Sequence, residues 1–136
     1  LGTGAHMGAL RRSATGRFDD TSLVTLHDLA DALAFWREDG NEGPLREAVA
    51  PAERALAALP RVVIAESAAR EVAHGAPVFA PGVLETRPAP HGGAQPETGA
   101  LVACTVPNGG AVALGPLTGD PDDDRGTVVD TDRVLV

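Results

Sequence analysis

The chain has 136 residues and a formal net charge of −8, which is enough length for one ordinary domain or for a small domain with an appendage. It contains no apolar run of about 18 residues and no basic-then-apolar leader, so neither a membrane span nor a secretory signal is predicted. The lone cysteine, Cys104, cannot form an internal disulfide. We therefore expect a soluble protein of a reducing, cytoplasmic compartment.

The charge balance is unusual because all eleven basic residues are arginine, against nineteen acidic residues. A GC-rich genome would favour arginine over lysine, whereas adaptation to molar salt would add carboxylates that keep the surface hydrated. Codon bias alone does not produce a charge of −8, so we favour a salt-loving archaeal source. At about 1 M salt the Debye length is about 3 Å, and the acidic surface would then repel a polyanion only weakly.

The first predicted helix follows residues 1–22, which are rich in glycine and poor in apolar anchors. Thr25 is expected to be its N-cap, with Asp28 three residues later, and Gly40 lies where the pattern ends. Its apolar stripe, which we expect to be buried, comprises Leu26, Leu29, Leu33 and Trp36.

A second helical segment is predicted to begin at Pro44 and to be interrupted at Pro51. The short β-branched run 61–65 then predicts a strand. Ser67 is expected to be the N-cap of another helix, which Gly75 would end in a left-handed conformation.

The remainder predicts a small β-structure. Residues 77–84 read as a strand and loop, and residues 100–106 and 111–114 read as a hairpin joined by a tight turn. Residues 119–125 form an acidic loop before the last strand or pair of strands at 127–129 and 133–136. Five or six short strands with one or two small helices favour a compact, partly open β-barrel.

Residues 4–18 read GAHMGALRRSATGRF, an order that packing alone does not require. The segment resembles a signature of the TruB/dyskerin family of RNA pseudouridine synthases, which closes the catalytic domain. The resemblance implies that Leu10 lies on the wall of the site that receives a flipped-out uridine. The nucleophilic aspartate of that site belongs to motifs that this chain does not contain, and the chain has no tyrosine.

Three other residues of this segment are candidate RNA contacts. Arg11 and Arg12 match phosphate groups in geometry, and the alternative is an ion pair with Asp19 or Asp20. His6 is either an RNA contact or a brace for the glycine-rich backbone, and the sequence does not favour one over the other.

Residues 67–83 resemble the helix, Gly-Ala turn and Pro-Gly-Val strand of a PUA domain. The resemblance implies a groove that binds the single-stranded 3′ end of an H/ACA guide RNA or a tRNA acceptor end. Its expected RNA-binding residues are His74, Gly75, Ala76, Pro81 and Gly82. A helix cap would explain Gly75 alone but not its pairing with the Pro-Gly turn. Phe79 is the one aromatic residue of this module, so backbone and shape contacts would carry much of the binding.

Together these observations predict an α+β chain. Residues 1–59 would be the tail of a pseudouridine synthase catalytic domain with linking helices, and residues 60–136 a PUA domain, a small mixed β-barrel. No metal site is expected, because the histidines are scattered and the acidic run 120–124 lacks the ligand spacing of a calcium loop. The resemblance implies a reaction that needs no organic cofactor.

The resulting hypothesis is the carboxy-terminal part of a pseudouridine synthase, an isomerase acting on tRNA or on guide-directed rRNA. This chain alone is expected to be inactive. Its expected partners are RNA and other core proteins of the H/ACA ribonucleoprotein, with no membrane. Two alternatives remain open: a free-standing PUA-type RNA-binding protein without catalytic activity, and a module that mainly docks other ribonucleoprotein subunits.

Overall fold

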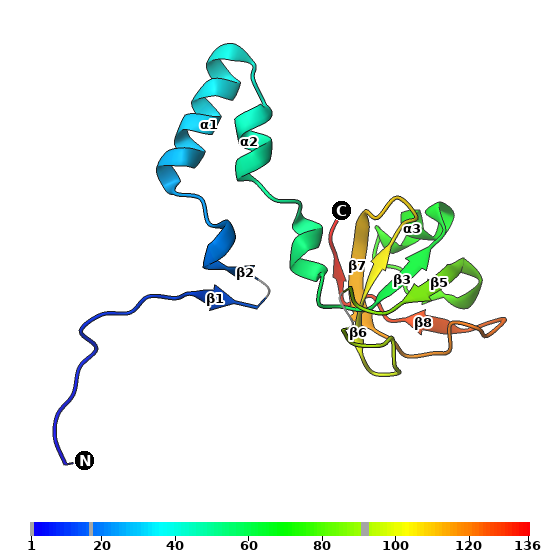
Figure 1. Cartoon of the computed structure of the whole chain (residues 1–136). Coiled ribbons are helices and arrows are strands. Elements are labelled where there is room, and N and C mark those ends of the chain that lie inside the picture. The colour runs from blue at the N-terminus through cyan, green and yellow to red at the C-terminus, as the bar shows by residue number, and fades with distance from the viewer. Residues whose placement is uncertain (1, 17, 91–92) are drawn as a thin grey trace. The chain divides into compact units, whose positions relative to one another are not determined.

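The computed structural model describes residues 2–16, 18–90 and 93–136. The chain divides into two compact units, residues 1–51 and 52–136, whose elements are shown in Figure 1. The sequence predicts a domain boundary between residues 59 and 60. The division into compact units does not test that boundary, which stays a prediction.

The first unit contains two short strands and two helices. Strands β1 (Ala14–Thr15) and β2 (Phe18–Asp19) pair antiparallel, and a 3₁₀ turn, η1 (Asp20–Ser22), follows them. Helices α1 (Leu26–Asp39) and α2 (Gly43–Ala48) then lie side by side (Figure 1).

Both ends of α1 are confirmed as the sequence predicts them. The Thr25 hydroxyl accepts a hydrogen bond from the Asp28 amide at 3.1 Å, and the Asp28 carboxylate accepts one from the Thr25 amide at 2.8 Å. This reciprocal pair satisfies two amides that helix geometry leaves without partners. Gly40 ends the helix with a positive φ of 67°, a conformation that glycine adopts without steric penalty.

The expected burial of the apolar stripe on α1 is wrong at its ends. Leu26 is 82% exposed and Trp36 is 43% exposed, while Leu29 and Leu33 are partly buried. Ala32 is the one buried apolar residue in the described part of this unit. The reason is that α2 has only six residues and covers a short length of α1.

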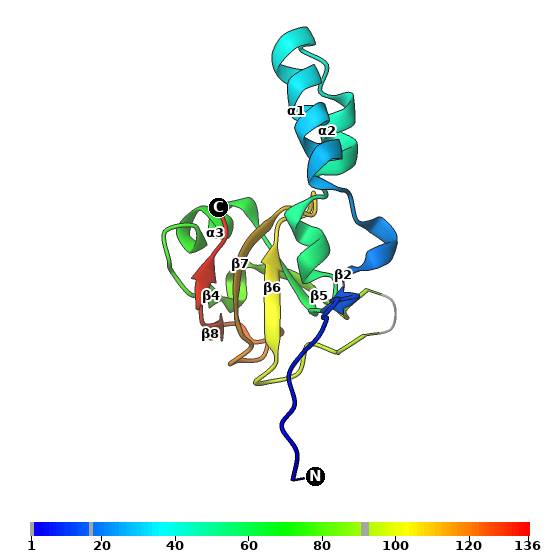
Figure 2. The same ribbon diagram turned by 90° about the vertical axis from the view of Figure 1, so that its left-hand side faces the viewer.

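The second unit is built around a five-stranded mixed sheet in the order β5-β3-β6-β7-β9, seen with β6 near its middle in Figure 2. Strand β3 (Arg61–Ile64) pairs antiparallel with β5 (Val83–Arg87) and parallel with β6 (Leu101–Thr105). Strand β7 (Ala111–Pro116) joins β6 to the edge strand β9 (Arg133–Val134). Strands β4 (Val78–Phe79) and β8 (Thr127–Val129) form a second, two-stranded sheet.

Three short helices complete this unit: η2 (Ala52–Leu56), α3 (Glu66–Val72) and η3 (Ala80–Gly82). The core is mainly valine and alanine. Consecutive residues of β3 and β6 are buried, so both faces of these two central strands are covered. The largest fully buried members of the core include Ile64, Leu117, Val62, Val72 and Val78. The predicted α+β class is confirmed. The helices in the described part of the chain do not combine the length and the apolar character that a membrane span requires.

The prediction for the start of α3 is wrong by two residues. Ala65 occupies the N-cap position, with no side-chain cap, and the helix begins at Glu66. The amide of Ala65 instead donates to the Gly82 carbonyl at 2.9 Å, so a contact distant in sequence positions this end of the helix. Ser67 is thereby free to take another role.

Candidate functional site

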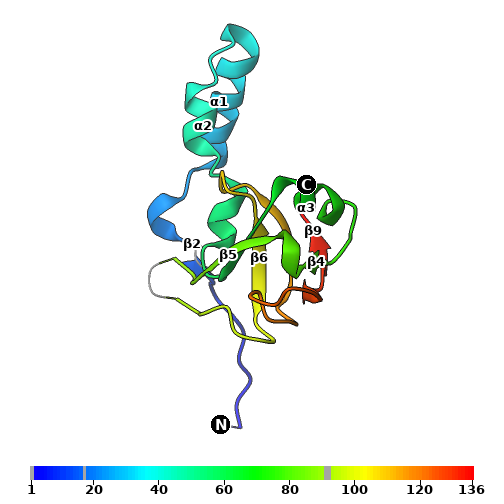
Figure 3. The ribbon, with the colours of Figure 1, turned by 90° about the vertical axis from the view of Figure 1, so that its right-hand side faces the viewer.

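A groove of about 480 Å³ lies where α3 meets the turn η3 and strand β4. Figure 3 labels α3 and β4. All of its lining belongs to the second unit. It is lined by Ser67, Ala68, Glu71, Ala76, Pro77, Phe79, Pro81 and Gly82.

One side of the groove depends on a close approach between α3 and η3. A Cβ atom at Gly82 would lie 2.8 Å from the Cβ of Ala68, closer than two such atoms pack. The Gly82 carbonyl accepts the Ala65 hydrogen bond described above, which holds the two backbones together. Small residues at positions 68 and 82 therefore set the width of the groove.

The loop after α3 closes the other side. Gly75 has a positive φ of 91°, and the Ala76 amide donates to the Glu71 carbonyl at 3.1 Å. The Thr131 hydroxyl donates to the Ala76 carbonyl at 2.7 Å and ties this loop to the end of β8. The left-handed conformation expected for Gly75 is confirmed.

The predicted RNA-binding residues divide into two groups. Ala76, Pro81 and Gly82 line the groove, whereas His74 and Gly75 do not. The His74 ring nitrogen Nδ1 lies 2.7 Å from the Arg70 carbonyl, a contact that braces the last turn of α3. The roles of all five residues in RNA binding stay predictions.

The groove is also lined by residues that the sequence alone did not single out as groove residues: Ser67, Ala68, Glu71 and Pro77. The helical spacing of Ser67 and Glu71, four residues apart, places them on one face of α3 and could have suggested a shared surface. Nothing in the local sequence shows that this face lies opposite Phe79. That pairing depends on how α3 packs against β4.

The chemistry of the groove suits a nucleobase better than a phosphate. The Phe79 side chain is 52% exposed and offers a flat aromatic face beside small apolar residues. Neither arginine nor histidine is among the described residues of its lining. Stacking of bases on aromatic side chains does not require a basic residue at the same place.

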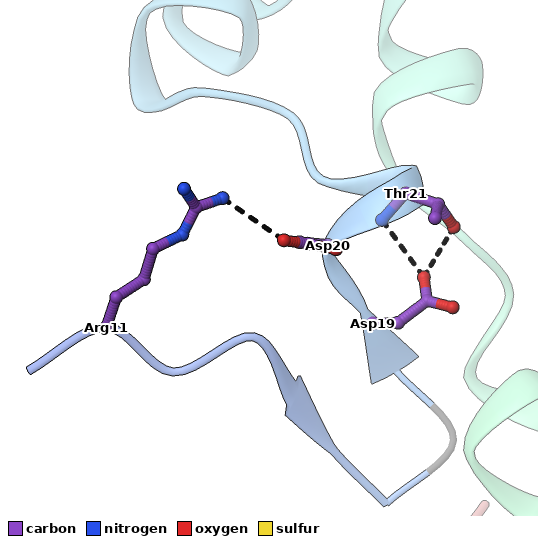
Figure 4. Close-up of polar contacts among 4 residues, drawn as sticks. All are labelled: Arg11, Asp19, Asp20 and Thr21. Atoms are coloured by element: carbon purple, nitrogen blue, oxygen red, sulfur yellow. Dashed lines mark hydrogen bonds and ion pairs between the residues drawn. The ribbon is translucent and has the colours of Figure 1, made fainter.

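The glycine-rich segment 4–18 shows a different environment. The Arg11 guanidinium lies 3.1 Å from the Asp20 carboxylate, and Asp19 accepts a hydrogen bond from the Thr21 amide (Figure 4). The ion-pair alternative for Arg11 is therefore present in the structure. Surface pairs of this kind contribute little to stability and do not prevent a contact with RNA.

The other candidates of this segment do not come together in one site. Leu10 is 75% exposed, and His6 is exposed. Arg12 borders a separate pocket of about 250 Å³ beside Phe18 and Leu23. Arg17 lies outside the described residues. The roles proposed for His6, Leu10, Arg11 and Arg12 stay predictions.

Among the described residues, no three potential ligands gather into a metal-binding group; His91 lies outside them. Cys104 is fully buried, and burial raises the pKa of its thiol to about 12. The thiol is thus neutral at physiological pH and is unsuited to act as a nucleophile. Hydrogen bonds from Thr25 lower the pKa of Asp28, which fits its capping role.

Comparison with known proteins supports the resemblance seen in the sequence. Residues 1–57 match the family model described as the tRNA pseudouridylate synthase B C-terminal domain. The chain is 64% identical over 99% of its length to a probable tRNA pseudouridine synthase B of Haloarcula marismortui, covering 43% of that protein. It is 62% identical over its full length to the Halobacterium salinarum protein of the same name, covering 46% of it. Both organisms are halophilic archaea, as the acidic composition predicts.

Comparison with solved structures supports the same family resemblance. The chain superposes on the crystal structure of the archaeal box H/ACA sRNP Nop10–Cbf5 complex with a TM-score of 0.82 and 39% identity, over 98% of this chain and 43% of the other. It also matches the H/ACA RNP bound to a substrate RNA containing 2′-deoxyuridine, with a TM-score of 0.82 and 38% identity. That match covers 100% of this chain and 43% of the other. A PUA domain from Aeropyrum pernix, at 22% identity and a TM-score of 0.50 over 60% of this chain and 50% of its own, shares the fold.

The chain spans less than half the length of these relatives from Haloarcula and Halobacterium. The part that it matches includes the synthase C-terminal domain and a PUA fold. By sequence and by fold, the chain therefore belongs to the archaeal TruB/dyskerin-type family of RNA pseudouridine synthases and corresponds to the carboxy-terminal part of its members.

Proposed function

We propose that the chain is part of an RNA pseudouridine synthase that isomerises uridine to pseudouridine in tRNA or in guide-directed rRNA. Within it, the second unit binds single-stranded RNA in the groove beside Phe79. The observation that carries this proposal is the groove itself, an exposed aromatic face bordered by small residues. The similarity to tRNA pseudouridine synthase B supports tRNA as a substrate. The similarity to Cbf5 in H/ACA complexes with Nop10 and with a substrate RNA supports H/ACA proteins and RNA as partners.

The groove contributes to the reaction by positioning. A base that stacks on Phe79 is held by dispersion and by exclusion of water, while the close backbone at Gly82 leaves room for it. Anchoring one end of the RNA fixes the register of the rest, which lowers the entropy that must be lost before the target uridine reaches its site. Neither stacking nor shape recognition weakens greatly in molar salt.

Replacing Phe79 by alanine tests this proposal. Loss of one stacked base is expected to weaken RNA binding about 5-fold to 150-fold, equivalent to about 1–3 kcal/mol. We would measure binding by fluorescence anisotropy in molar salt, using an RNA with a single-stranded ACA end, a tRNA acceptor end and a scrambled RNA. Selective binding of one of the first two identifies the natural ligand.

Phe35→Ala is the matched control, because Phe35 lies on α1 and is 49% exposed, close to the exposure of Phe79. Its RNA affinity should equal that of the wild type. If Phe79→Ala binds as tightly as Phe35→Ala, the groove is not the RNA-binding site. Equal binding of all three RNAs by the wild type would instead favour a role in docking other subunits.

The purified 136-residue chain is expected to form no pseudouridine. The family's nucleophilic aspartate motif does not occur in it, and the proposed role of the groove is to position RNA. The measurement is quantification of pseudouridine in tRNA after incubation, with the Haloarcula marismortui synthase as positive control. Pseudouridine formed by the chain alone would show that a different set of residues is catalytic.

A further inference from the structure

The groove carries one charged side chain among its described lining residues, the carboxylate of Glu71. The backbone of Glu71 is held in place, because its carbonyl accepts hydrogen bonds from the amides of His74 at 3.0 Å and Ala76 at 3.1 Å. The side chain is exposed and has no hydrogen bond or ion pair within the described part of the chain. Its carboxylate is therefore available to a ligand.

The electrostatics at Glu71 disfavour a phosphate at this end of the groove. The residue lies in the last turn of α3, where the aligned peptide dipoles give a helix end partial negative charge. An ionised carboxylate adds to that charge, and no cation among the described lining residues offsets it. RNA bound here is consequently expected to place a base, not its backbone, against Glu71.

A carboxylate can only accept hydrogen bonds, so it selects a base by the donors on that base's edge. Adenine, cytosine and guanine carry an exocyclic amino group, and uracil carries none. The pairing of glutamate or aspartate with an amino group of cytosine is a known mode of base recognition in nucleic-acid complexes.

We propose that Glu71 is a specificity-determining residue, which accepts a hydrogen bond from the exocyclic amino group of a base stacked in the groove. This inference rests on the proposed function of the groove in RNA binding. The groove then prefers amino-bearing bases to uracil, although its stacking face, Phe79, accepts any base.

The test compares two short single-stranded RNAs that differ only in one functional group: an oligoadenosine and the matching purine-riboside oligomer, which lacks the amino groups. In molar salt, the wild type should bind the adenosine oligomer about 10-fold to 150-fold more tightly, as expected for one hydrogen bond to a charged acceptor. Glu71→Ala should remove most of this ratio. Glu71→Gln, which keeps a weaker neutral acceptor, should reduce it to an intermediate value.

Glu66→Gln is the control, because it removes the same charge from the same helix but does not line the groove. It should leave the ratio unchanged. Adenine and purine also differ in stacking, but this difference affects the affinity ratio of the two oligomers equally in the wild type and in each variant. It therefore cancels when the ratios of the wild type and a variant are compared.

Two results would overturn the proposal in distinguishable ways. If Glu71→Ala and Glu71→Gln bind both oligomers more tightly by the same factor, Glu71 acts only through its charge and does not read the base. If no RNA binds the wild type, or if Phe79→Ala has no effect on binding, the groove is not an RNA site, and the proposed function fails together with this inference.

Discussion

Raising the pH from about 8 to about 11 is expected to lower the free energy of unfolding of the second unit by about 2–3 kcal/mol. The cause is a single residue, Cys104. Its side chain is fully buried in the core, and burial raises the pKa of the thiol from its ordinary value near 9.0 to about 12.

The sign follows from the two protonation states. Above about pH 9 the thiol ionises in the unfolded chain but remains neutral in the folded one, so the unfolded state is favoured increasingly as the pH rises. The stabilisation is fully present below pH 9 and is lost as the pH approaches 12. Each pH unit between these limits lowers stability by about 1.4 kcal/mol.

The composition makes this effect unusually easy to isolate. The chain contains no lysine and no tyrosine, and arginine stays charged over the whole range, so Cys104 is the one side chain of these 136 residues that titrates there.

We would follow urea unfolding by the NMR methyl signals of Val62 and Val129, two buried residues of the same unit. Cys104→Ala should be less stable at neutral pH but should show a flat profile. A profile as steep as that of the wild type would assign the alkaline loss to the backbone or to another group.

Replacing Gly115 by alanine is expected to destabilise the second unit by about 3 kcal/mol or more. Gly115 lies in β7 opposite Val102, and a Cβ atom there would overlap the carbonyl oxygen of Asp130 and lie 2.9 Å from its carbonyl carbon. The backbone of Asp130 cannot move aside for the added Cβ atom as the end of a flexible side chain could. Moving it would disturb the hydrogen bond from the Asp130 amide to the Pro116 carbonyl, which is 3.2 Å long. The free energy of unfolding of a native protein is typically about 5–15 kcal/mol, so this loss is a large fraction of it.

Gly110→Ala is the matched control in the same unit. Its Cβ atom would meet only side-chain ends, those of Asn108 at 3.3 Å and Val106 at 3.4 Å, which can shift slightly. We expect a change within about 0.5 kcal/mol. The same urea titration at neutral pH measures both variants. If they were equally stable, the close approach of residues 115 and 130 would not constrain the fold.

The elements that the sequence predicts well are those determined by near neighbours. The Thr25–Asp28 pair and Gly40 define the two ends of α1, because each acts on amides or carbonyls within one helical turn. Strands β3, β6 and β7 were likewise predictable from their β-branched and apolar composition. The order of residues 4–18 and 67–83 identified the family without any structure.

The predictions failed where a residue's surroundings come from distant parts of the chain. Ser67 was expected to cap α3, but the Gly82 carbonyl holds Ala65 in that position instead. Leu26 and Trp36 follow the periodicity of a buried stripe, yet α2 is too short to cover them. Periodicity shows which side chains share a face and does not show what covers that face.

The sequence by itself thus determined the family, the α+β class and the positions of most elements, since short-range capping, turn and β-branched signals specify them. Only the tertiary structure decided that Glu71, Phe79 and Gly82 share one groove and that Gly115 must lack a side chain. These features arise from contacts between segments far apart in sequence, and such contacts are set by packing of the whole unit rather than by local preference.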